Sequence, residues 1–391
     1  MFSYKNNFAP RGDGRCATSM AAWMQYLRSI KPSLAFTDAC CTSLEAFTKW
    51  QQAVRTRLEA RLLMPVSNCK VEGKLLETLP RNGYTLERWE FYPDEFTVVP
   101  FLLLRPEKLA SPVPGVICCP GSAAPKELLA GEPMPENGNM RNYKFNDRNC
   151  QALHCVRNGF IAAAMDNPGT GEVAELDSSN KETQWETREK LVQGYIDGGT
   201  TYLGVSVFQK LRFIEFFKKM PGVDPERLAV MGHSLGSEPA MALGVLSDDI
   251  KAVVFNDFLC DERRRYVGCT ELEHSEINDG GNWHEVPGIW QDFAFPDILA
   301  ALAPKYLCIN EGGSEEFLGK VRRSYEFLHA ADRLDISYYP YYKDAEKIQQ
   351  SVPLYGMSIR EYYEYYSRVY SSDHSFRAAE SMALLKKAFV E

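Results

Sequence analysis

The sequence lacks any long hydrophobic run. Its longest apolar stretches, such as residues 159–165, are far shorter than the roughly 20 residues that a helix needs to cross a bilayer. The first 15 residues are polar, and no apolar segment follows them, so we expect no secretory signal peptide. These absences predict a protein without a membrane-spanning segment, located in the cytoplasm.

The sequence also lacks an excess of positive charge and any CxxC cysteine motif. The formal net charge is −8, so a basic face for nucleic acid or for anionic lipid is not expected. There are 11 cysteines, an odd number, but no CxxC pair, which argues against zinc and thioredoxin-like sites and favours a reducing compartment. We therefore expect no nucleic-acid or membrane partner, no metal and no cofactor. Assembly into a homo-oligomer stays open.

The composition that is present is that of a globular protein with a large core: 45% hydrophobic and 25% charged residues. Apolar residues recur at helical spacing over residues 20–64, and with period two over residues 70–105. Beyond residue 110, short apolar strands alternate with helical stretches, which is typical of a mainly parallel sheet covered on both faces. We predict an α/β fold with a helical extension over residues 1–69 and a larger domain over residues 70–391. The extension is expected to pack against the domain rather than to bind substrate.

One motif indicates chemistry: Gly232-His233-Ser234-Leu235-Gly236. An apolar strand precedes it and a helical stretch follows it. A serine in so tight a turn needs small neighbours, and the helix then directs its positive end toward the hydroxyl. A GxSxG pattern would occur by chance only about 0.1 times in a chain of this length. The motif in this setting is typical of the nucleophile elbow of α/β hydrolases, and predicts Ser234 as a nucleophile.

A serine nucleophile needs a base, and in α/β hydrolases the acid and then the histidine follow the serine along the chain. His374 lies in a polar loop before the last helical stretch, where the fold places its base. His329 falls in a helical run and is interpreted as a packing or surface residue. His274 and His284 come too early, in a long insertion. We therefore predict His374 as the general base.

The acid is expected after the last apolar strand of the series, where it would orient the imidazole and stabilise the imidazolium. Many α/β hydrolases place it three residues after a glycine at this strand end, and counting from Gly312 selects Glu315. Glu311 and Glu316 beside it stay open as alternatives, and so does Asp257 after the preceding strand.

An oxyanion hole needs two amide N–H donors. One is expected from Leu235, the residue after the nucleophile. The other is expected from the loop after the strand at residues 114–119, at Gly121, Ser122 or Ala123.

A family resemblance rests on several stretches of residues 70–391. They are residues 114–122, Lys126-Glu127, Gly131-Glu132, 165–169, 232–236, 293–304 and 311–313. Together they resemble acetyl xylan esterase-like α/β hydrolases, including esterases encoded near bacterial polysaccharide-utilisation genes. Residues 293–304 are similar to the dienelactone-hydrolase and acetyl-esterase branch. The resemblance implies an α/β-hydrolase fold and ester hydrolysis by a Ser–Asp/Glu–His triad without a cofactor.

In this fold, insertions near the last strands cover the site, so residues 259–291 are expected to form a lid. Trp283 and Trp290 can offer flat faces to a sugar ring, and His284 is a further substrate-binding candidate. The two tryptophans can equally belong to the core of the insertion, and both interpretations stay open.

These expectations combine into one main hypothesis: a carboxylic ester hydrolase that removes acetyl or another small acyl group from a small-molecule or oligosaccharide ester. A peptidase acting on short acyl- or aminoacyl-peptides is the first alternative. The region before residue 110 is too short for the propeller domain that such enzymes usually carry. A non-catalytic interaction module is the second alternative, and the complete Ser–acid–His set argues against it.

Overall fold

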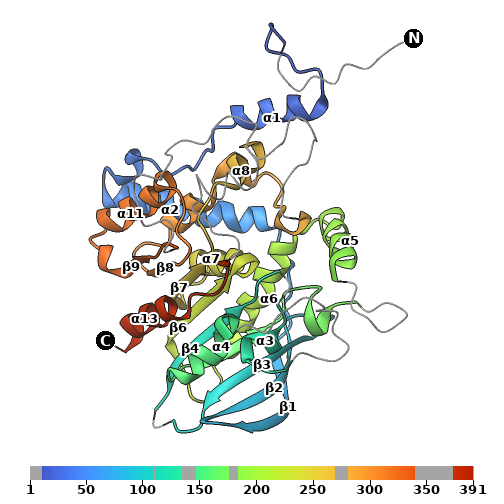
Figure 1. Ribbon diagram of the computed structural model, residues 1–391, viewed down its shortest axis with the longest axis vertical. Helices are drawn as coiled ribbons and strands as arrows, with labels where there is room; N and C mark the ends of the chain where they lie inside the picture. Colours follow the sequence, from blue (N-terminus) through green and yellow to red (C-terminus); the bar gives the residue numbers. More distant parts are fainter. Residues whose placement is uncertain are drawn as a thin grey trace.

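The computed structural model describes residues 11–109, 111–122, 124–133, 147–175, 184–268, 281–339 and 373–390. Within these ranges a nine-stranded sheet forms the centre of the molecule, in the order β1-β2-β3-β5-β4-β6-β7-β8-β9 (Figure 1). The strands are β1 (Glu72–Arg81), β2 (Tyr84–Tyr92), β3 (Val99–Pro106), β4 (Val113–Cys119), β5 (Ile161–Met165), β6 (Val223–His233), β7 (Ile250–Asn256), β8 (Tyr306–Ile309) and β9 (Leu334–Ile336).

The type of strand pairing changes once across the sheet. β1, β2, β3 and β5 pair antiparallel to one another, whereas β5, β4, β6, β7, β8 and β9 pair parallel. The predicted mainly parallel sheet is therefore confirmed, and the period-two stretch at residues 70–105 forms its antiparallel part. Sequence patterning missed β9, since three residues are too few to show a period.

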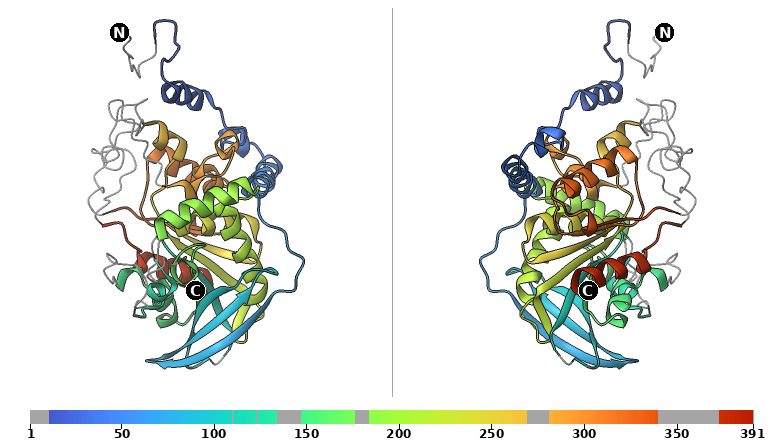
Figure 2. Two further views of the ribbon diagram at one scale, coloured as in Figure 1. Left: turned by 90° about the vertical axis from the view of Figure 1, so that its right-hand side faces the viewer. Right: turned by 90° about the vertical axis from the view of Figure 1, so that its left-hand side faces the viewer.

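Helices cover both faces of the sheet (Figure 2). The described helices are α1 (Ser19–Ser29), α2 (Leu44–Leu62), α3 (Lys126–Ala130), α4 (Gln151–Arg157), α5 (Gln184–Asp197), α6 (Tyr202–Phe217), α7 (Ser237–Leu246), α8 (Glu262–Gly268), α9 (Ile289–Asp292), α10 (Phe295–Ala300), α11 (Glu315–Phe327) and α13 (Ala378–Phe389). Helices α2, α6, α7, α10 and α11 supply side chains to the core on one face, and α3, α4 and α13 to the core on the other. None of these helices is long and apolar enough to span a bilayer.

The neighbouring cysteines of β4 illustrate why the parallel strands are apolar throughout. Cys118 and Cys119 are both fully buried, but they belong to the cores on opposite faces of the sheet. Side chains alternate across a strand, so a strand covered on both faces needs apolar residues at every position. Both cysteines are free thiols.

Helix α2 joins the N-terminal extension to the main core. The helix begins after Ser43. The Ser43 hydroxyl accepts a hydrogen bond from the N–H of Ala46, one of the first-turn N–H groups that have no partner within the helix. The buried residues of this helix repeat at three- and four-residue spacing (Phe47, Trp50, Val54, Leu58 and Leu62). Gln51 also donates to the carbonyl oxygens of Ala301 and Ala303. The expectation that the extension packs against the larger domain is confirmed for α2.

Because α2 is part of the core, a cavity made in its buried face should destabilise the whole protein. We expect Leu58→Ala to lower the free energy of unfolding by about 2–5 kcal/mol, since Leu58 is 1% exposed. The matched variant Leu44→Ala, in the same helix but 65% exposed, should change it by less than about 0.5 kcal/mol. Urea unfolding measures both. An unchanged midpoint for Leu58→Ala would contradict the packing of α2 in the core.

Candidate active site

Ser234 occupies a strained turn at the carboxyl end of β6. The strand ends at His233, residues 234–236 form a single 3₁₀ turn, and α7 begins at Ser237. The φ angle of Ser234 is 52°, in the left-handed region that is costly for any residue other than glycine. Such strain is a feature of the nucleophile elbow, because it lifts the serine hydroxyl above the sheet.

The two glycines of the motif are required by close backbone contacts. A β-carbon on Gly232 would lie 2.0 Å from the carbonyl oxygen of Gly236. One on Gly236 would lie 2.2 Å from the carbonyl oxygen of Cys119, at the end of β4. The steric reason inferred from the sequence is therefore confirmed, and the elbow is pressed against the neighbouring strand.

Ser234 and His374 line one cavity of about 710 Å³. This volume is within the usual range for a small-molecule site. The walls come from residues far apart in the sequence: Ser122 and Leu235 beside the serine, and residues 281–291 of the insertion. Helix α1 also contributes Trp23 and Leu27, and Ile30 directly follows the helix. The expectation that the N-terminal extension only packs is thus incomplete, since α1 forms part of the cavity wall.

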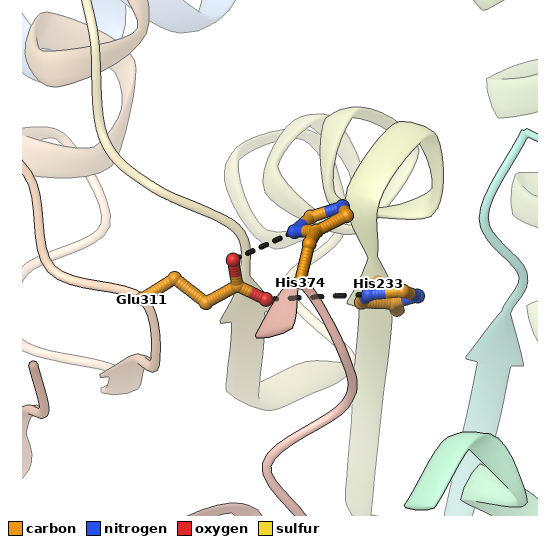
Figure 3. Close-up of side chains that lie close together, drawn as sticks. All are labelled: His233, Glu311 and His374. Carbon is orange, nitrogen blue, oxygen red and sulfur yellow. Dashed lines mark hydrogen bonds and ion pairs between the residues drawn. The ribbon is translucent and has the colours of Figure 1, made fainter. Parts of the chain in front are cut away.

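His374 is paired with a buried carboxylate, that of Glu311 (Figure 3). The imidazole Nδ1 lies 2.7 Å from Oε2 of Glu311, which is fully buried. Asn256 donates to Oε1 at 2.9 Å, and the Tyr339 hydroxyl donates to Oε2. Burial by itself disfavours the imidazolium, but the charge and hydrogen bond of Glu311 raise the pKa of His374 to about 9. The carboxylate is therefore fixed in the position that orients a catalytic imidazole.

The prediction that Glu315 would orient His374 disagrees with this geometry. Glu315 begins α11, is 38% exposed at its side chain, and binds Arg322 at 2.5 Å and the Tyr338 hydroxyl at 2.7 Å. Gly312 and Gly313, with φ angles of 68° and 144°, turn the chain sharply after Glu311. This turn carries Glu315 away from the strand end, so that Glu311, one of the open alternatives, meets the histidine.

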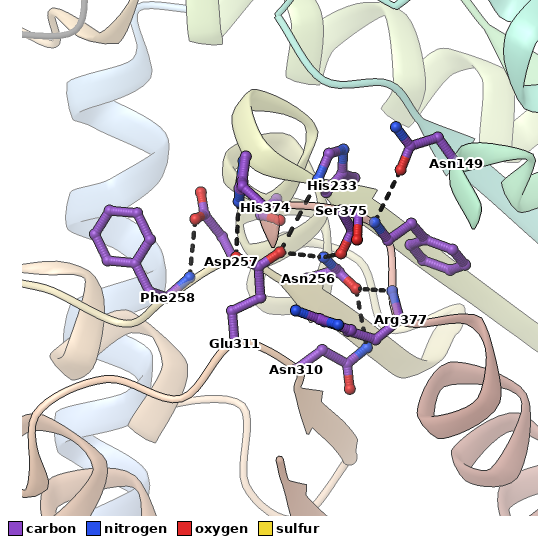
Figure 4. Close-up of polar contacts among 12 residues, drawn as sticks. Asn149, His233, Asn256, Asp257, Phe258, Asn310, Glu311, His374, Ser375 and Arg377 are labelled. Carbon is purple, nitrogen blue, oxygen red and sulfur yellow. Dashed lines mark hydrogen bonds and ion pairs between the residues drawn. The ribbon is translucent and has the colours of Figure 1, made fainter. Parts of the chain in front are cut away.

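The other two alternative acids also have partners elsewhere. Glu316 pairs with Arg264 at 2.7 Å. Asp257 lies near His374 and lines the cavity, but its Oδ1 accepts the N–H of Phe258 at 2.8 Å (Figure 4). Burial raises the pKa of Asp257 to about 7, although the positive charge of His374 opposes the shift. Among these carboxylates, the hydrogen bond to His374 belongs to Glu311.

Asn256 fixes the loop that carries His374 (Figure 4). Its side chain donates to the carbonyl oxygen of Ser375 at 3.2 Å and accepts the N–H of Arg377 at 2.6 Å. The same amide group binds Glu311. The buried side chain of Asn256 therefore fixes both the Glu311 carboxylate and the loop that carries His374.

His233, directly before the nucleophile, lies against the pair. Its ring centroid is 4.7 Å from that of His374, and its Nε2 lies 4.0 Å from Oε1 of Glu311. Burial, with the positive charges of His374 and Arg377, holds the pKa of His233 well below its usual value. The ligand atoms of His233, Glu311 and His374 lie within 4.8 Å of one another, a spacing that a metal site would also need. Because the oxygens of Glu311 already accept three hydrogen bonds, the arrangement fits an oriented imidazole better.

The predicted oxyanion loop lies against the nucleophile and is held through its carbonyl groups. A β-carbon on Gly121 would lie 3.5 Å from Cβ of Ser234, so the loop passes close to the nucleophile. Three buried side chains donate to carbonyl oxygens behind the loop, between residues 119 and 122. They are Gln151 to Cys119 at 3.2 Å, Asn167 to Pro120 at 2.9 Å, and Arg188 to Ser122 at 2.5 Å. Fixing the carbonyl groups leaves the amide plane of each residue little freedom, which is the preorganisation that an oxyanion hole needs.

Arg188 connects this loop to the insertion. Its guanidinium carbon lies 3.8 Å from the ring centroid of Trp283, and both side chains are buried. Trp283 packs in a small cluster with Val192, Tyr202 and Leu235. The core interpretation of this tryptophan is therefore supported, although its edge also lines the cavity. Trp290, at α9, is partly buried against Met24 and Leu27 and lines the cavity as well.

Sequence reasoning missed the residues that support the site. Asn167 falls in residues 165–169, which contributed only to the family resemblance, and its side chain lies beside the oxyanion loop. Asn256, at the end of β7, had the one available signal, a polar side chain closing an apolar strand. No sequence signal pointed to Arg188 or Tyr339, because their hydrogen-bond partners are distant in the sequence. His274 lies outside the described residues.

Comparisons with known proteins agree with this fold. Residues 2–387 match the model of the Abhydrolase family. A protein of Bacteroides fragilis NCTC 9343, provisionally named an acetyl xylan esterase, is similar in structure, with a TM-score of 0.89, 31% identity and 98% of each chain covered. A glucuronoyl esterase from Solibacter usitatus is similar in fold alone, with a TM-score of 0.52, 15% identity, and 86% of this chain and 93% of that chain covered. The curated protein sequences contain no match. The predicted α/β-hydrolase fold is confirmed.

The close contacts of the elbow glycines predict that a side chain at Gly236 destabilises the protein. We expect Gly236→Ala to lower the free energy of unfolding by more than about 2 kcal/mol, because the new β-carbon must displace the Cys119 carbonyl. Gly319→Ala in α11 is the matched control: nothing lies within 4 Å of its β-carbon, so the change should stabilise by up to about 1 kcal/mol. Urea unfolding compares the two. Equal stabilities would show that the turn tolerates a side chain.

Proposed function

This chain belongs to the Abhydrolase family, and on that premise we propose that it is a serine carboxylic ester hydrolase with Ser234, His374 and Glu311 as its catalytic triad. The observation that carries the proposal is the buried Glu311–His374 pair at the same cavity as a serine in a strained elbow turn. The chain order Ser, Glu, His is the order of this fold.

The reaction proceeds in two halves. The Ser234 hydroxyl attacks the ester carbonyl carbon while Nε2 of His374 takes its proton, and Glu311 at Nδ1 stabilises the imidazolium. The carbonyl oxygen becomes an oxyanion that the N–H groups of Leu235 and of Gly121 or Ser122 stabilise. His374 then returns the proton to the leaving alcohol as the C–O bond breaks. Water, deprotonated by His374, hydrolyses the acyl-enzyme and restores Ser234.

The substrate class proposed is an acetyl or another small acyl ester of a carbohydrate. Support comes from the name of the Bacteroides fragilis relative, which covers 98% of this chain at 31% identity. The cavity adds support of its own, because it combines aromatic faces (Trp23 and Trp290) with polar groups, among them His284 and Glu238. Flat apolar faces and hydrogen-bonding groups together are what a sugar ring requires.

The role of Ser234 is tested with p-nitrophenyl acetate and an acetylated xyloside. We expect Ser234→Ala to lower kcat for both by at least about 10⁴-fold, because the nucleophile is lost while binding is retained. A fluorophosphonate probe should label the wild type and leave the variant unlabelled. Equal rates for the two proteins would overturn the mechanism. Cleavage of aminoacyl-peptides in preference to acetyl esters would favour the peptidase alternative.

The identity of the acid is tested by a matched pair of substitutions. Glu311→Gln should lower kcat/KM for p-nitrophenyl acetate by about 10³- to 10⁴-fold, because the amide no longer stabilises the imidazolium. Glu315 lies four residues further along the chain, and its carboxylate binds Arg322. Glu315→Gln should therefore leave the activity close to that of the wild type. A larger loss for Glu315→Gln would assign the acid to that residue instead.

The pH dependence of the same pair is an independent readout. Only the neutral imidazole can accept the serine proton, and Glu311 raises the pKa of His374 to about 9. Activity of the wild type should therefore rise with pH and level off above about 9. In Glu311→Gln the cause of the raised pKa is absent, so the inflection should move down toward the ordinary value of 6.5. An inflection that stays in place would contradict the pairing.

A further inference from the structure

The cavity contains a second histidine–carboxylate pair, which the proposed mechanism does not use. Nδ1 of His284 is hydrogen-bonded to Oε1 of Glu238. Both residues line the cavity that holds Ser234 and His374. The His284 side chain is 26% exposed and that of Glu238 only 8%, so the carboxylate lies behind the imidazole. The imidazole is therefore the member of the pair that a bound substrate can reach.

Glu238 has a fixed position relative to the nucleophile. It is the second residue of α7, four residues after Ser234, and a carboxylate in the first turn of a helix is favoured by the positive end of the helix dipole. Its other oxygen, Oε2, is buried and has no hydrogen-bond partner among the described residues. The hydrogen bond with His284 is thus the main polar contact of this carboxylate that the structure shows.

His284 is held equally firmly from the insertion. The preceding residue, Trp283, is 4% exposed and lies beneath the guanidinium of Arg188, whose Nη1 binds the oxyanion loop at Ser122. Asn282 donates from its side chain to the carbonyl oxygen of Glu189 in α5 at 3.1 Å. The segment that carries His284 is therefore fixed to the same elements that build the oxyanion loop.

The hydrogen bond decides which groups of the imidazole remain for a ligand. A carboxylate accepts, so Nδ1 of His284 donates its hydrogen to Glu238 and the neutral ring keeps a lone pair at Nε2. The charge of Glu238 strengthens this acceptor, as carboxylates do behind the imidazoles of metal sites. A substrate hydroxyl can donate to Nε2. The charged side chains along the described cavity wall are Glu238, Asp257, Glu262 and Glu285, together with Arg265.

We propose that His284, oriented by Glu238, binds a free hydroxyl group of the sugar that carries the ester, and so determines specificity for the alcohol part of the substrate. This inference rests on the proposed esterase function. In this proposal, Nε2 of His284 contacts the substrate, and Glu238 holds the imidazole in the position that makes this contact possible. Esters whose alcohol part has no hydroxyl group do not use the pair.

Two substitutions at position 284 separate substrate binding from anchoring of the insertion. In His284→Asn the side-chain amide can still donate to Glu238 from the position of Nδ1, but nothing occupies the position of Nε2. In His284→Gln the longer side chain places a polar atom near Nε2. His329→Asn, at an exposed histidine, is the matched control.

The assay compares p-nitrophenyl acetate with a monoacetylated methyl xyloside and with its deoxy analogue, which lacks the hydroxyl next to the ester. For His284→Asn we expect kcat/KM on the xyloside to fall about 10- to 100-fold, mainly through KM, with little change on p-nitrophenyl acetate. His284→Gln should recover part of the loss. The wild type should prefer the xyloside to its deoxy analogue, and His284→Asn should not.

Four other outcomes would overturn the proposal or the function on which it rests. An equal loss on all three esters would show that His284 only anchors the insertion, and would overturn the proposal. Undiminished discrimination between the xyloside and its deoxy analogue in His284→Asn would overturn it as well. If the wild type hydrolyses p-nitrophenyl acetate but not the xyloside, the serine mechanism stands and the sugar specificity falls. If it hydrolyses none of the esters, the proposed function itself fails.

Discussion

The close approach of the elbow to the end of β4 is the constraint on which the rest of the site depends. Gly236 has no room for a β-carbon because the Cys119 carbonyl lies where one would be. This contact brings the serine turn and the oxyanion loop, which begins just after Cys119, within van der Waals distance. The φ angle of 52° at Ser234 is sustained by the packing around it, since isolated chains rarely adopt it.

Around that contact, the site is assembled from the carboxyl ends of neighbouring parallel strands. The oxyanion loop follows β4, Asn167 follows β5, Ser234 follows β6, and Glu311 follows β8. Parallel strands present these ends along one edge, so residues nearly 200 positions apart become neighbours. Asn256, the last residue of β7, connects the edge to the loop of His374.

The insertion does more than cover this edge. Trp283 lies against Arg188, and Arg188 holds a carbonyl group of the oxyanion loop, so the wall of the cavity and this loop share a support. Helix α1 closes another part of the wall, and Arg263 at the start of the insertion donates to the carbonyl oxygens of Leu27 and Ile30 at its end. The insertion, the oxyanion loop and helix α1 are thus joined by direct contacts.

The sequence by itself determined whatever depends on local pattern. The parallel strands follow from continuous apolar runs, the elbow from two glycines around Ser234, and the position of His374 from chain order in the fold. Tertiary structure alone decided between Glu311 and Glu315. Both follow the same strand, but the turn at Gly312 and Gly313 directs one toward His374 and the other toward Arg322. It also decided the partners of Asn256, Arg188 and Glu238, because a side-chain contact between distant segments leaves no periodic trace in a single sequence.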